Sequence, residues 1–568
     1  MKRIVTGTAA LLGLAFLAAC GGGGGTTTSQ GPKTANGVTV GEQPGGVAVN
    51  KEAADAFSTA VSDFKKHEEA RDWDDGSCSS VSGEFLSAGK AQGGKFPAAH
   101  YNAGIVLLRC GRETDAGAEF ETALTEAAEL ANGSSDPKAK ADPVFHQCWV
   151  QKALIKYRTG SPAAITEAID MIESKGFDPD GSRNVEAFVN LGMLYRERWV
   201  KDPTNPARSK KDKFNLEDDL ARAQFWLQNA LSINDSFMPA YNQLALYYLD
   251  KARAVGEKRM AEKKKLGVVK PKNDAEKEKM AKEAKIKADL QTLELGLLVS
   301  EEASRRDGNY AGIWNTQGLL LLEMNRTGAA TQAFKRATEK DAKFFEAWMN
   351  YAAINLAFRG YGEATTGYKA ASGIRPKDYD AKLGLAVATR GQLDYHLTTK
   401  QAMERKLSEC SDPDKASTPA CQEASSKFPG QIKENEAKFL GYYKEAIVAY
   451  EAAKTLDAGR PEAFFDQALL VEKYKAKSGQ ATTAVAYREA EKLYNELVSK
   501  FSGNAKYTKL VDDAKNRATE AGKSADFEEK AMAAPPPPPP ATTSSAKPAA
   551  SGGASATPAT SASAKPKP

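Results

Sequence analysis

The 568-residue sequence has few of the side chains that metal centres and many active sites use. Its four histidines are His67, His100, His146 and His396, and no two of them have the spacing of metal ligands. It contains neither the H-E-x-x-H motif of zinc peptidases nor the G-x-S-x-G motif of serine hydrolases. We therefore expect a chain that is not an enzyme and binds no metal or cofactor. Carboxylates are abundant, so a catalytic pair brought together by folding stays an alternative.

Cysteine, long apolar runs and excess charge are also scarce. Six cysteines are too few for a disulfide scaffold, and no run of 18 apolar residues predicts an ordinary transmembrane helix. A formal net charge of +5 and a pI near 8.5 do not indicate nucleic-acid binding. The length excludes a single small domain. The length and the composition favour several globular units or one long repeat array.

The N-terminus has the layout of an export signal. Lys2 and Arg3 precede a short apolar segment over residues 4–17, which predicts a signal peptide over residues 1–19. Leu-Ala-Ala stands directly before Cys20, and this pattern resembles the lipobox of bacterial lipoproteins. The resemblance implies that the signal is removed and that lipid chains join Cys20. The alternative is an ordinary signal peptide in which the cysteine stands by chance.

Both ends of the chain are predicted to be non-globular. Residues 20–50 begin with a Gly/Thr run, which is typical of a flexible linker. By resemblance, glycine rather than aspartate after the lipidated cysteine implies the outer membrane, facing the periplasm or the cell surface. Residues 522–568 are predicted to be a disordered tail rich in Pro, Ala and Ser, with a polyproline run at 535–540. This tail is either a spacer or a docking peptide.

The middle of the chain repeats itself. Residues 311–344 align with residues 345–378 at a shift of 34. The spacing W-x3-[GA]-x11-A-x3-[FY]-x2-A resembles the tetratricopeptide repeat, in which each unit is a pair of antiparallel helices. In that repeat, small residues let the two backbones approach, and large ones such as Trp348 and Tyr368 fill the gap between neighbouring units. The matched positions are Trp314 with Trp348, Gly318 with Ala352, Ala330 with Ala364, Phe334 with Tyr368, and Ala337 with Ala371.

Further copies of this spacing occur along most of the chain, for example at Gly104, Phe120 and Gly192. We therefore predict an all-α tetratricopeptide (TPR) helical solenoid of about eight to nine repeats over residues 51–521, with helical insertions. An irregular helical bundle is the alternative.

The resemblance also implies a concave face lined by the first helix of each unit. In peptide-binding members of the family, an asparagine two residues before the Gly/Ala position bonds the ligand backbone. Asn102, Asn190 and Asn350 match that position and are the predicted partner-binding groove. An amide side chain suits this role because it offers a donor and an acceptor. Local bonding on the helix surface is the alternative.

Three segments exceed the repeat length, residues 200–215, 251–290 and 401–438, and as insertions they are predicted to carry binding. Residues 251–290 are predicted to form an inserted basic helical hairpin, and residues 401–438 an inserted loop. The segment 251–287 holds 14 Lys and Arg against six Asp and Glu, so its net charge of +8 exceeds that of the whole chain. We expect this arm to contact an acidic partner, although a solvated face is the alternative. The arm residues are Lys258, Arg259, Lys263, Lys264 and Lys265.

Export makes disulfides permissible. Cys410 and Cys421 flank a polar loop that a bridge would close. Cys78 and Cys110 are predicted to lie at the same end of neighbouring helices and to form a second disulfide. Cys148 lies at the opposite end and is the predicted unpaired, buried cysteine.

These features together predict a protein–protein interaction scaffold in the bacterial envelope. Envelope proteins would bind in the groove and on the insertions, and the lipid would bind the membrane. The layout of lipobox, degenerate repeats and Pro/Ala/Ser tail is similar to that of TPR lipoproteins of the myxobacterial adventurous gliding motility machinery. The alternatives are a pilotin-like assembly factor for a secretin or outer-membrane protein complex, and a component of polysaccharide export or the cell wall.

Overall fold

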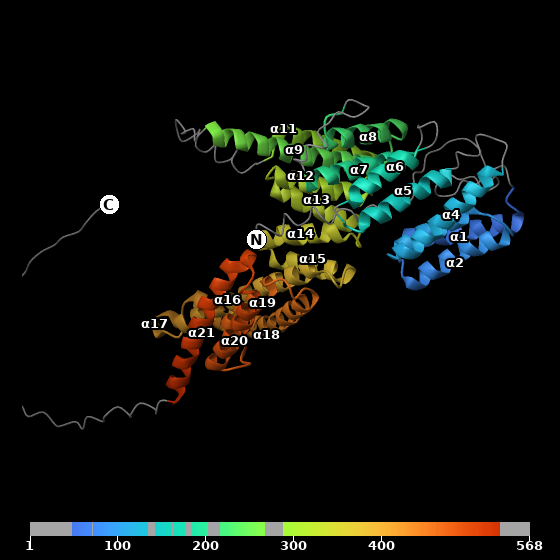
Figure 1. The fold of residues 1–568 in the computed structure, drawn as a ribbon. Helices are drawn as coiled ribbons and strands as arrows, with labels where there is room; N and C mark the ends of the chain where they lie inside the picture. The colour runs from blue at the N-terminus through green and yellow to red at the C-terminus, as the bar shows by residue number, and fades with distance from the viewer. Residues whose placement is uncertain are drawn as a thin grey trace, which may run out of the picture. The chain divides into compact units, whose positions relative to one another are not determined.

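A computed structural model describes residues 48–70, 72–133, 143–161, 163–177, 184–202, 216–266 and 288–533, with only the backbone of 143–145 and 260–266. These described residues are built from α-helices and two short 3₁₀ helices (Figure 1). The chain divides into two units, Met1–Gln467 and Ala468–Pro568, and each is described by itself. The predicted signal peptide, Cys20 and most of the linker lie outside the described residues, as does the tail from residue 534.

The first unit is a row of antiparallel helix pairs that follow one another in sequence (Figure 1). The pairs are α1 (Lys51–Ala70) with α2 (Asp75–Ala91), α3 (Pro97–Arg109) with α4 (Glu113–Asn132), α5 (Pro143–Arg158) with α6 (Ala164–Lys175), α7 (Val185–Lys201) with α8 (Asp219–Ile233), α9 (Met238–Leu266) with α11 (Leu290–Arg306), α12 (Ala311–Glu323) with α13 (Thr327–Lys340), α14 (Phe345–Ala357) with α15 (Tyr361–Ile374), and α16 (Tyr379–Glu409) with α18 (Pro419–Leu456).

The second unit contains α20 (Thr483–Phe501) and α21 (Thr508–Ala533), which pack on each other. The helix before them, α19 (Glu462–Tyr474), begins in the first unit and ends in the second. Its C-terminal part contacts α20, because Tyr494 Oη donates a hydrogen bond of 2.6 Å to Glu472. Among the described residues the first unit holds eight helix pairs and the second unit one, α20 with α21, and the predicted all-α TPR solenoid of about eight to nine repeats is confirmed.

Small residues stand where the two helices of a pair come closest. A Cβ added to Gly318 in α12 would lie 2.5 Å from the ring of Phe334 in α13. The same addition at Gly104 would lie 2.6 Å from Phe120. Any larger side chain would have to push the two helices apart, so these positions confirm the predicted role of the small residues.

The large residues of the repeat divide into two kinds. Tyr368 is fully buried, and its ring reaches Gly384 on α16 of the next pair, where an added Cβ would lie 2.3 Å away. This confirms its predicted place between units. Trp348 is half-buried, and its equivalent Trp314 packs against Ala337 of its own pair and against Phe344 and Ala347 at the start of the next. The Trp348 indole Nε1 donates 2.8 Å to Ala342 O in the preceding turn. Trp314 makes the equivalent 2.9 Å bond to Gly308 O, again 34 residues earlier.

The predicted inserted loop over residues 401–438 is wrong: the segment is helical. α16 continues to Glu409, a short helix α17 (Pro413–Ala416) turns the chain, and α18 returns from Pro419. Ion pairs four residues apart support the return helix, for example Lys427 Nζ with Glu423 at 2.8 Å. Segment length alone indicated the loop, whereas these side-chain spacings favour a helix.

The predicted boundary of the tail at residue 522 is also wrong, because α21 continues to Ala533. Ala525 is fully buried in this last stretch. Asp526 and Glu529 both pair with Arg488 on α20. Packing against α20 therefore keeps these residues in the fold.

The basic insertion is described in part. α9 runs on to Leu266, as predicted for its first half, whereas residues 267–287 lie outside the described part. Lys258 is exposed. Arg259 donates to Ala288 O at 3.2 Å, at the start of the next helix. The side chains of Lys263, Lys264 and Lys265 lie outside the described part.

The turns between paired helices use a left-handed residue. Gly111 and Gly160 have φ near +70°, and Arg359 occupies an equivalent turn with φ +63° and an exposed side chain. A left-handed conformation costs a residue with a Cβ about 1–2 kcal/mol, partly offset by the larger entropy that glycine loses on folding.

Arg359→Gly is therefore expected to raise the free energy of unfolding by about 1 kcal/mol. Urea unfolding followed by circular dichroism measures the change. The matched control is Arg326→Gly, because Arg326 has φ −90° and gains nothing from glycine. A loss of stability in Arg359→Gly would contradict the strain argument.

Candidate functional site

The first helices of neighbouring pairs face one another. α7 contacts α9, α9 contacts α12, and α12 contacts α14, whereas the second helices of neighbouring pairs make no comparable contacts among the described residues. The first helices therefore line the inner side of the array. This is the face on which the sequence predicted partner binding.

A buried charge network lies at the centre of this inner face. Arg196 on α7 donates to Asp250 on α9 at 2.7 Å, to Glu197 at 2.6 Å and to Gln243 Oε1 at 3.2 Å. Arg196, Glu197 and Asp250 are each less than 10% exposed. Burial raises the pKa of the Glu197 carboxyl, and the Arg196 guanidinium opposes that shift. Three charges can stay buried here because each has a close partner.

Polar contacts continue from first helix to first helix on both sides of this network. We call the whole set the polar seam. Besides the network of Arg196, its contacts are Arg109 Nε with Glu68 Oε1 at 2.6 Å, Arg253 Nη2 with Glu323 Oε1 at 2.6 Å, Thr316 Oγ1 with Asn242 Oδ1 at 2.6 Å, and Asn350 Nδ2 with Asn315 Oδ1 at 2.9 Å. The seam ties each first helix involved to a neighbouring pair.

The three asparagines of the predicted groove use their amide donors inside the chain. Asn102 Nδ2 donates to Ala98 O at 2.7 Å, and Asn190 Nδ2 donates to Glu186 O at 2.8 Å. These two make the local helix bond that was the alternative, whereas Asn350 is part of the polar seam. Asn190 Oδ1 is buried without a hydrogen-bond partner in the described part of the chain. Ligand binding by these residues stays a prediction.

The charged network was missed at the sequence level, although a signal was present. Arg196 and Glu197 stand in a helix whose buried side is apolar apart from Asn190. A charged pair at such a position predicts a partner from a neighbouring element, but the sequence does not say which one. Only the fold brings Asp250 within reach, 54 residues away.

Arg196→Met is expected to lower the free energy of unfolding by about 3–5 kcal/mol, because it leaves buried carboxylates without their cation. The loss depends on pH. Without Arg196 the pKa of Glu197 rises further above its unfolded value. The deficit relative to the unmodified chain is therefore greatest near about pH 7 and shrinks as the pH falls toward about 5.

Chemical unfolding at several pH values measures this loss. Arg306→Met is the matched control, since Arg306 pairs with Asp235 at 3.1 Å on the exposed surface of the same unit. Its removal should cost much less and show little pH dependence. An equal loss in the two variants would contradict the importance of the buried network.

Two cysteine pairs are joined in the structure. Cys78 and Cys110 have Cα atoms 6.5 Å apart, and Cys410 and Cys421 have Cα atoms 5.3 Å apart. Both separations fit the normal range for a disulfide. Cys148 is buried and takes part in neither bond. The second pair lies beside α17 and closes the tip of the α16–α18 hairpin.

We expect both pairs to be oxidised in the folded protein. Non-reducing peptide mapping should recover the Cys78–Cys110 and Cys410–Cys421 peptides and an alkylated Cys148 peptide. A bridge closing a loop of about ten residues contributes on the order of 3 kcal/mol. Cys421→Ser should therefore increase hydrogen exchange near the hairpin tip while α12–α15 stay protected. A dominant Cys110–Cys148 peptide would contradict the pairing.

Metal binding and membrane crossing are two further possibilities for the described residues. In that part of the chain, no group of His, Cys, Asp and Glu is arranged to hold a metal ion. Of the helices within the described ranges, none combines the length and apolar character needed to cross a membrane.

The chain matches no protein-family model and no curated protein. It is similar in fold to several solved structures. MamA of Desulfovibrio magneticus RS-1 is 14% identical over 38% of this chain and 88% of its own, with a TM-score of 0.25. YrrB, described as a TPR protein with an unusual peptide-binding site, is 13% identical over 54% of this chain and 99% of its own, with a TM-score of 0.25. A human IFIT1 dimer with m7Gppp-AAAA is 14% identical over 80% of this chain and 82% of its own, with a TM-score of 0.30.

Proposed function

We propose that this protein is a non-enzymatic scaffold that binds other proteins through the inner face of its TPR array and through its helical insertions. One observation carries the proposal. A complete repeat needs helices of only 13 and 14 residues, as α12 to α15 show. α9 has 29 residues, α16 has 31 and α18 has 38. The additional turns are not needed for stacking, so they are surface that the array holds in place for partners.

We further propose that Cys20 carries a lipid anchor in the bacterial outer membrane. This rests on the lipobox-like residues before Cys20 and on the glycine after it. Thirty residues separate Cys20 from Lys51, where α1 begins. A Gly-rich chain of that length spans roughly 30 Å on average, enough to hold the array close to a membrane. Within this class, the layout favours assembly of an envelope machine such as that of gliding motility.

Cys20→Ser is expected to prevent lipid attachment, because serine lacks the thiol that accepts the lipid. The variant should remain unprocessed and leave the outer-membrane fraction. Gel mobility of envelope fractions and mass analysis of the N-terminal peptide measure both effects. Cys148→Ser serves as the control for loss of a thiol elsewhere. Unchanged size and fractionation of the Cys20 variant would contradict the anchor.

The basic arm is proposed to bind an acidic partner. Lys258→Glu with Lys264→Glu should reduce recovery of that partner from detergent-solubilised envelopes, and Arg259 is kept because it bonds Ala288. Recovery by the unmodified chain should fall with salt, since exposed charges are screened over roughly 8–10 Å near physiological ionic strength. The control is Lys433→Glu with Lys444→Glu, two exposed lysines of α18. Equal recovery with all three proteins would show that the arm is only a solvated face.

A further inference from the structure

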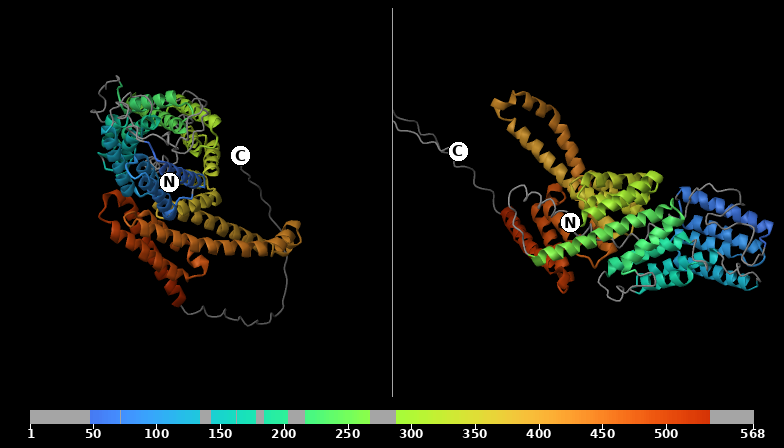
Figure 2. Two further views of the ribbon diagram at one scale, coloured as in Figure 1. Left: turned by 90° about the vertical axis from the view of Figure 1, so that its right-hand side faces the viewer. Right: turned by 90° about the horizontal axis from the view of Figure 1, so that it is seen from above.

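The α16–α18 hairpin extends well beyond the neighbouring helix pairs. Figure 2 shows its two long helices leaving the row together and meeting again at the tip, where α17 and the Cys410–Cys421 pair close it. Near the base, His396 Nδ1 lies 2.7 Å from Asn435 Oδ1, and the His396 ring stacks on Tyr442. The two helices are therefore fastened to each other at both ends.

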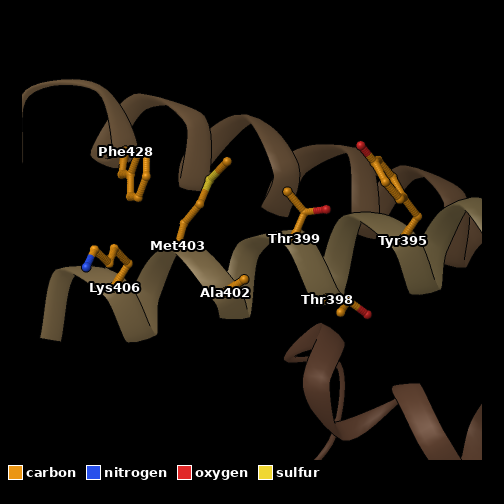
Figure 3. Close-up of a pocket in the computed structure, with 7 residues that line it drawn as sticks. All are labelled: Tyr395, Thr398, Thr399, Ala402, Met403, Lys406 and Phe428. Carbon is orange, nitrogen blue, oxygen red and sulfur yellow. The ribbon is translucent and has the colours of Figure 1, made fainter. Parts of the chain in front are cut away.

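Between these fastened ends the two helices leave a hollow of about 470 Å³ (Figure 3). Phe428 of α18 forms one wall, and a single stripe of α16 forms the other. The stripe repeats at i, i+3, i+4, i+7, i+8 and i+11, which places its members on one helix face. Eleven residues at 1.5 Å each make it about 16 Å long. We call this hollow the hairpin slot; its α16 residues are Tyr395, Thr398, Thr399, Ala402, Met403 and Lys406.

The sequence of α18 explains why the helices part here. Pro429 lies inside this helix, directly after Phe428, and Gly430 follows. Proline has no N–H to bond the carbonyl four residues earlier, and its ring clashes with that carbonyl, so it bends a helix. Phe428 on the tip side of the bend packs with Leu407 and the Cys410–Cys421 cluster. The position of Pro429 next to Phe428 therefore explains why the slot lies at this point of the hairpin.

The slot is apolar and open to solvent. Tyr395 is 61% exposed, although it is a large aromatic residue. The charges nearby are mostly neutralised within the hairpin: Lys400 pairs with Glu436 at 2.8 Å, and Lys438 pairs with Glu434 at 2.7 Å. A partner would therefore be recognised mainly through apolar contact rather than through net charge.

The tip end of the slot differs from the rest because two basic side chains lie there. Lys406 lines that end, and its contact with Glu409 is long, at 3.4 Å, and exposed. Arg405 stands next to it, exposed and without an ion pair among the described residues. Two cations at the tip end and apolar side chains along the rest define the chemistry of a complementary ligand.

We propose that the hairpin slot receives one amphipathic helix of a partner protein. Its apolar face would cover Tyr395, Ala402, Met403 and Phe428, and an acidic residue or its C-terminus would meet Arg405 and Lys406. A groove between two antiparallel helices, lined at helical spacing for three turns, is the seat that a third helix takes in a bundle. The negative end of a helix dipole and an acidic side chain both suit the positive end. The proposal rests on the scaffold function above and names the kind of partner for one insertion.

A display library tests this without knowledge of the natural partner. The full chain is screened against a library of 20-residue helices with randomised surfaces and, separately, against a library of proline-rich extended peptides. We expect helices with apolar residues at i, i+3, i+4 and i+7 and an acidic residue near one end. Met403→Glu should weaken the selected helix by about tenfold or more, because it places a charge against the apolar face. Arg405→Glu with Lys406→Glu should weaken acidic helices and spare variants in which the acid is replaced by lysine.

Val448→Glu is the matched control. Val448 is an apolar, 68% exposed residue of α18, the other helix of the hairpin, and it lies outside the slot. This variant should leave binding within about twofold of the unmodified chain. Circular dichroism and hydrogen exchange of each variant establish that the hairpin is folded. A second slot variant, Thr399→Trp, fills the hollow without adding charge and should also weaken binding.

Several outcomes would overturn the proposal. They are selection of proline-rich ligands only, self-association of the chain that depends on Met403, binding unaffected by the slot variants, and no selected ligand at all. The scaffold function is tested separately by recovery of envelope partners with the full chain. Partners recovered equally with the Met403→Glu variant would overturn the slot alone, whereas no recovered partner at all would overturn the scaffold function.

Discussion

The whole array depends on one contact that is repeated along the chain: a large side chain of a second helix packs against a residue with little or no side chain on the first. Phe334 against Gly318 and Leu227 against Gly192 are two examples, with added Cβ distances of 2.5 Å in both. The contact sets how closely a pair can approach and therefore which faces remain for the next pair. Because each pair buries its surface mainly against its neighbours, the stability of such an array is close to a sum of local terms.

Because each helix pair is stabilised mainly by its neighbours, the buried charges can help to select the correct stacking of those neighbours. Arg196, Glu197 and Asp250 are desolvated, and a buried ionic network often contributes less stability than apolar packing of the same volume. In a row of similar pairs, however, many wrong registers would also bury apolar surface. A network that joins α7 to α9 only in the native register raises the free energy of such slipped arrangements. We regard specificity of stacking as the physical reason for the polar seam.

The same stabilisation by neighbours allows additions at the ends of the repeat helices. α16 and α18 extend past the array without disturbing it, because their extra turns contact mainly each other. Such an extension needs its own stabilisation, and this hairpin has contacts at both ends: the stacked His396 and Tyr442 at the base and the Cys410–Cys421 pair at the tip. Pro429, in the tip-side part of α18, bends the helix between these two contacts. The result is a hairpin joined at its base and its tip around an apolar slot.

The sequence by itself determined the repeat, its period and the places where helices come close. These are local properties, because the spacing of Gly318, Ala330 and Phe334 encodes which faces of two consecutive helices meet. The placement of Cys78 opposite Cys110 at one end of neighbouring helices followed from the same logic, since the length of a helix fixes where its ends lie.

Only the tertiary structure decided what the inner face and the insertions are. The sequence singled out Asn102 and Asn190 without showing that their amides bond their own helices. It also could not pair Arg196 with Asp250, because the distance between them depends on how two units stack. Residues 401–438 and 522–533 were assigned to a loop and a tail, although α16 and α18 pack on each other and α21 packs on α20, which keeps these residues helical. Local sequence fixes which segments can be helices, and contacts with distant segments determine which of them stay helical and what their exposed faces present.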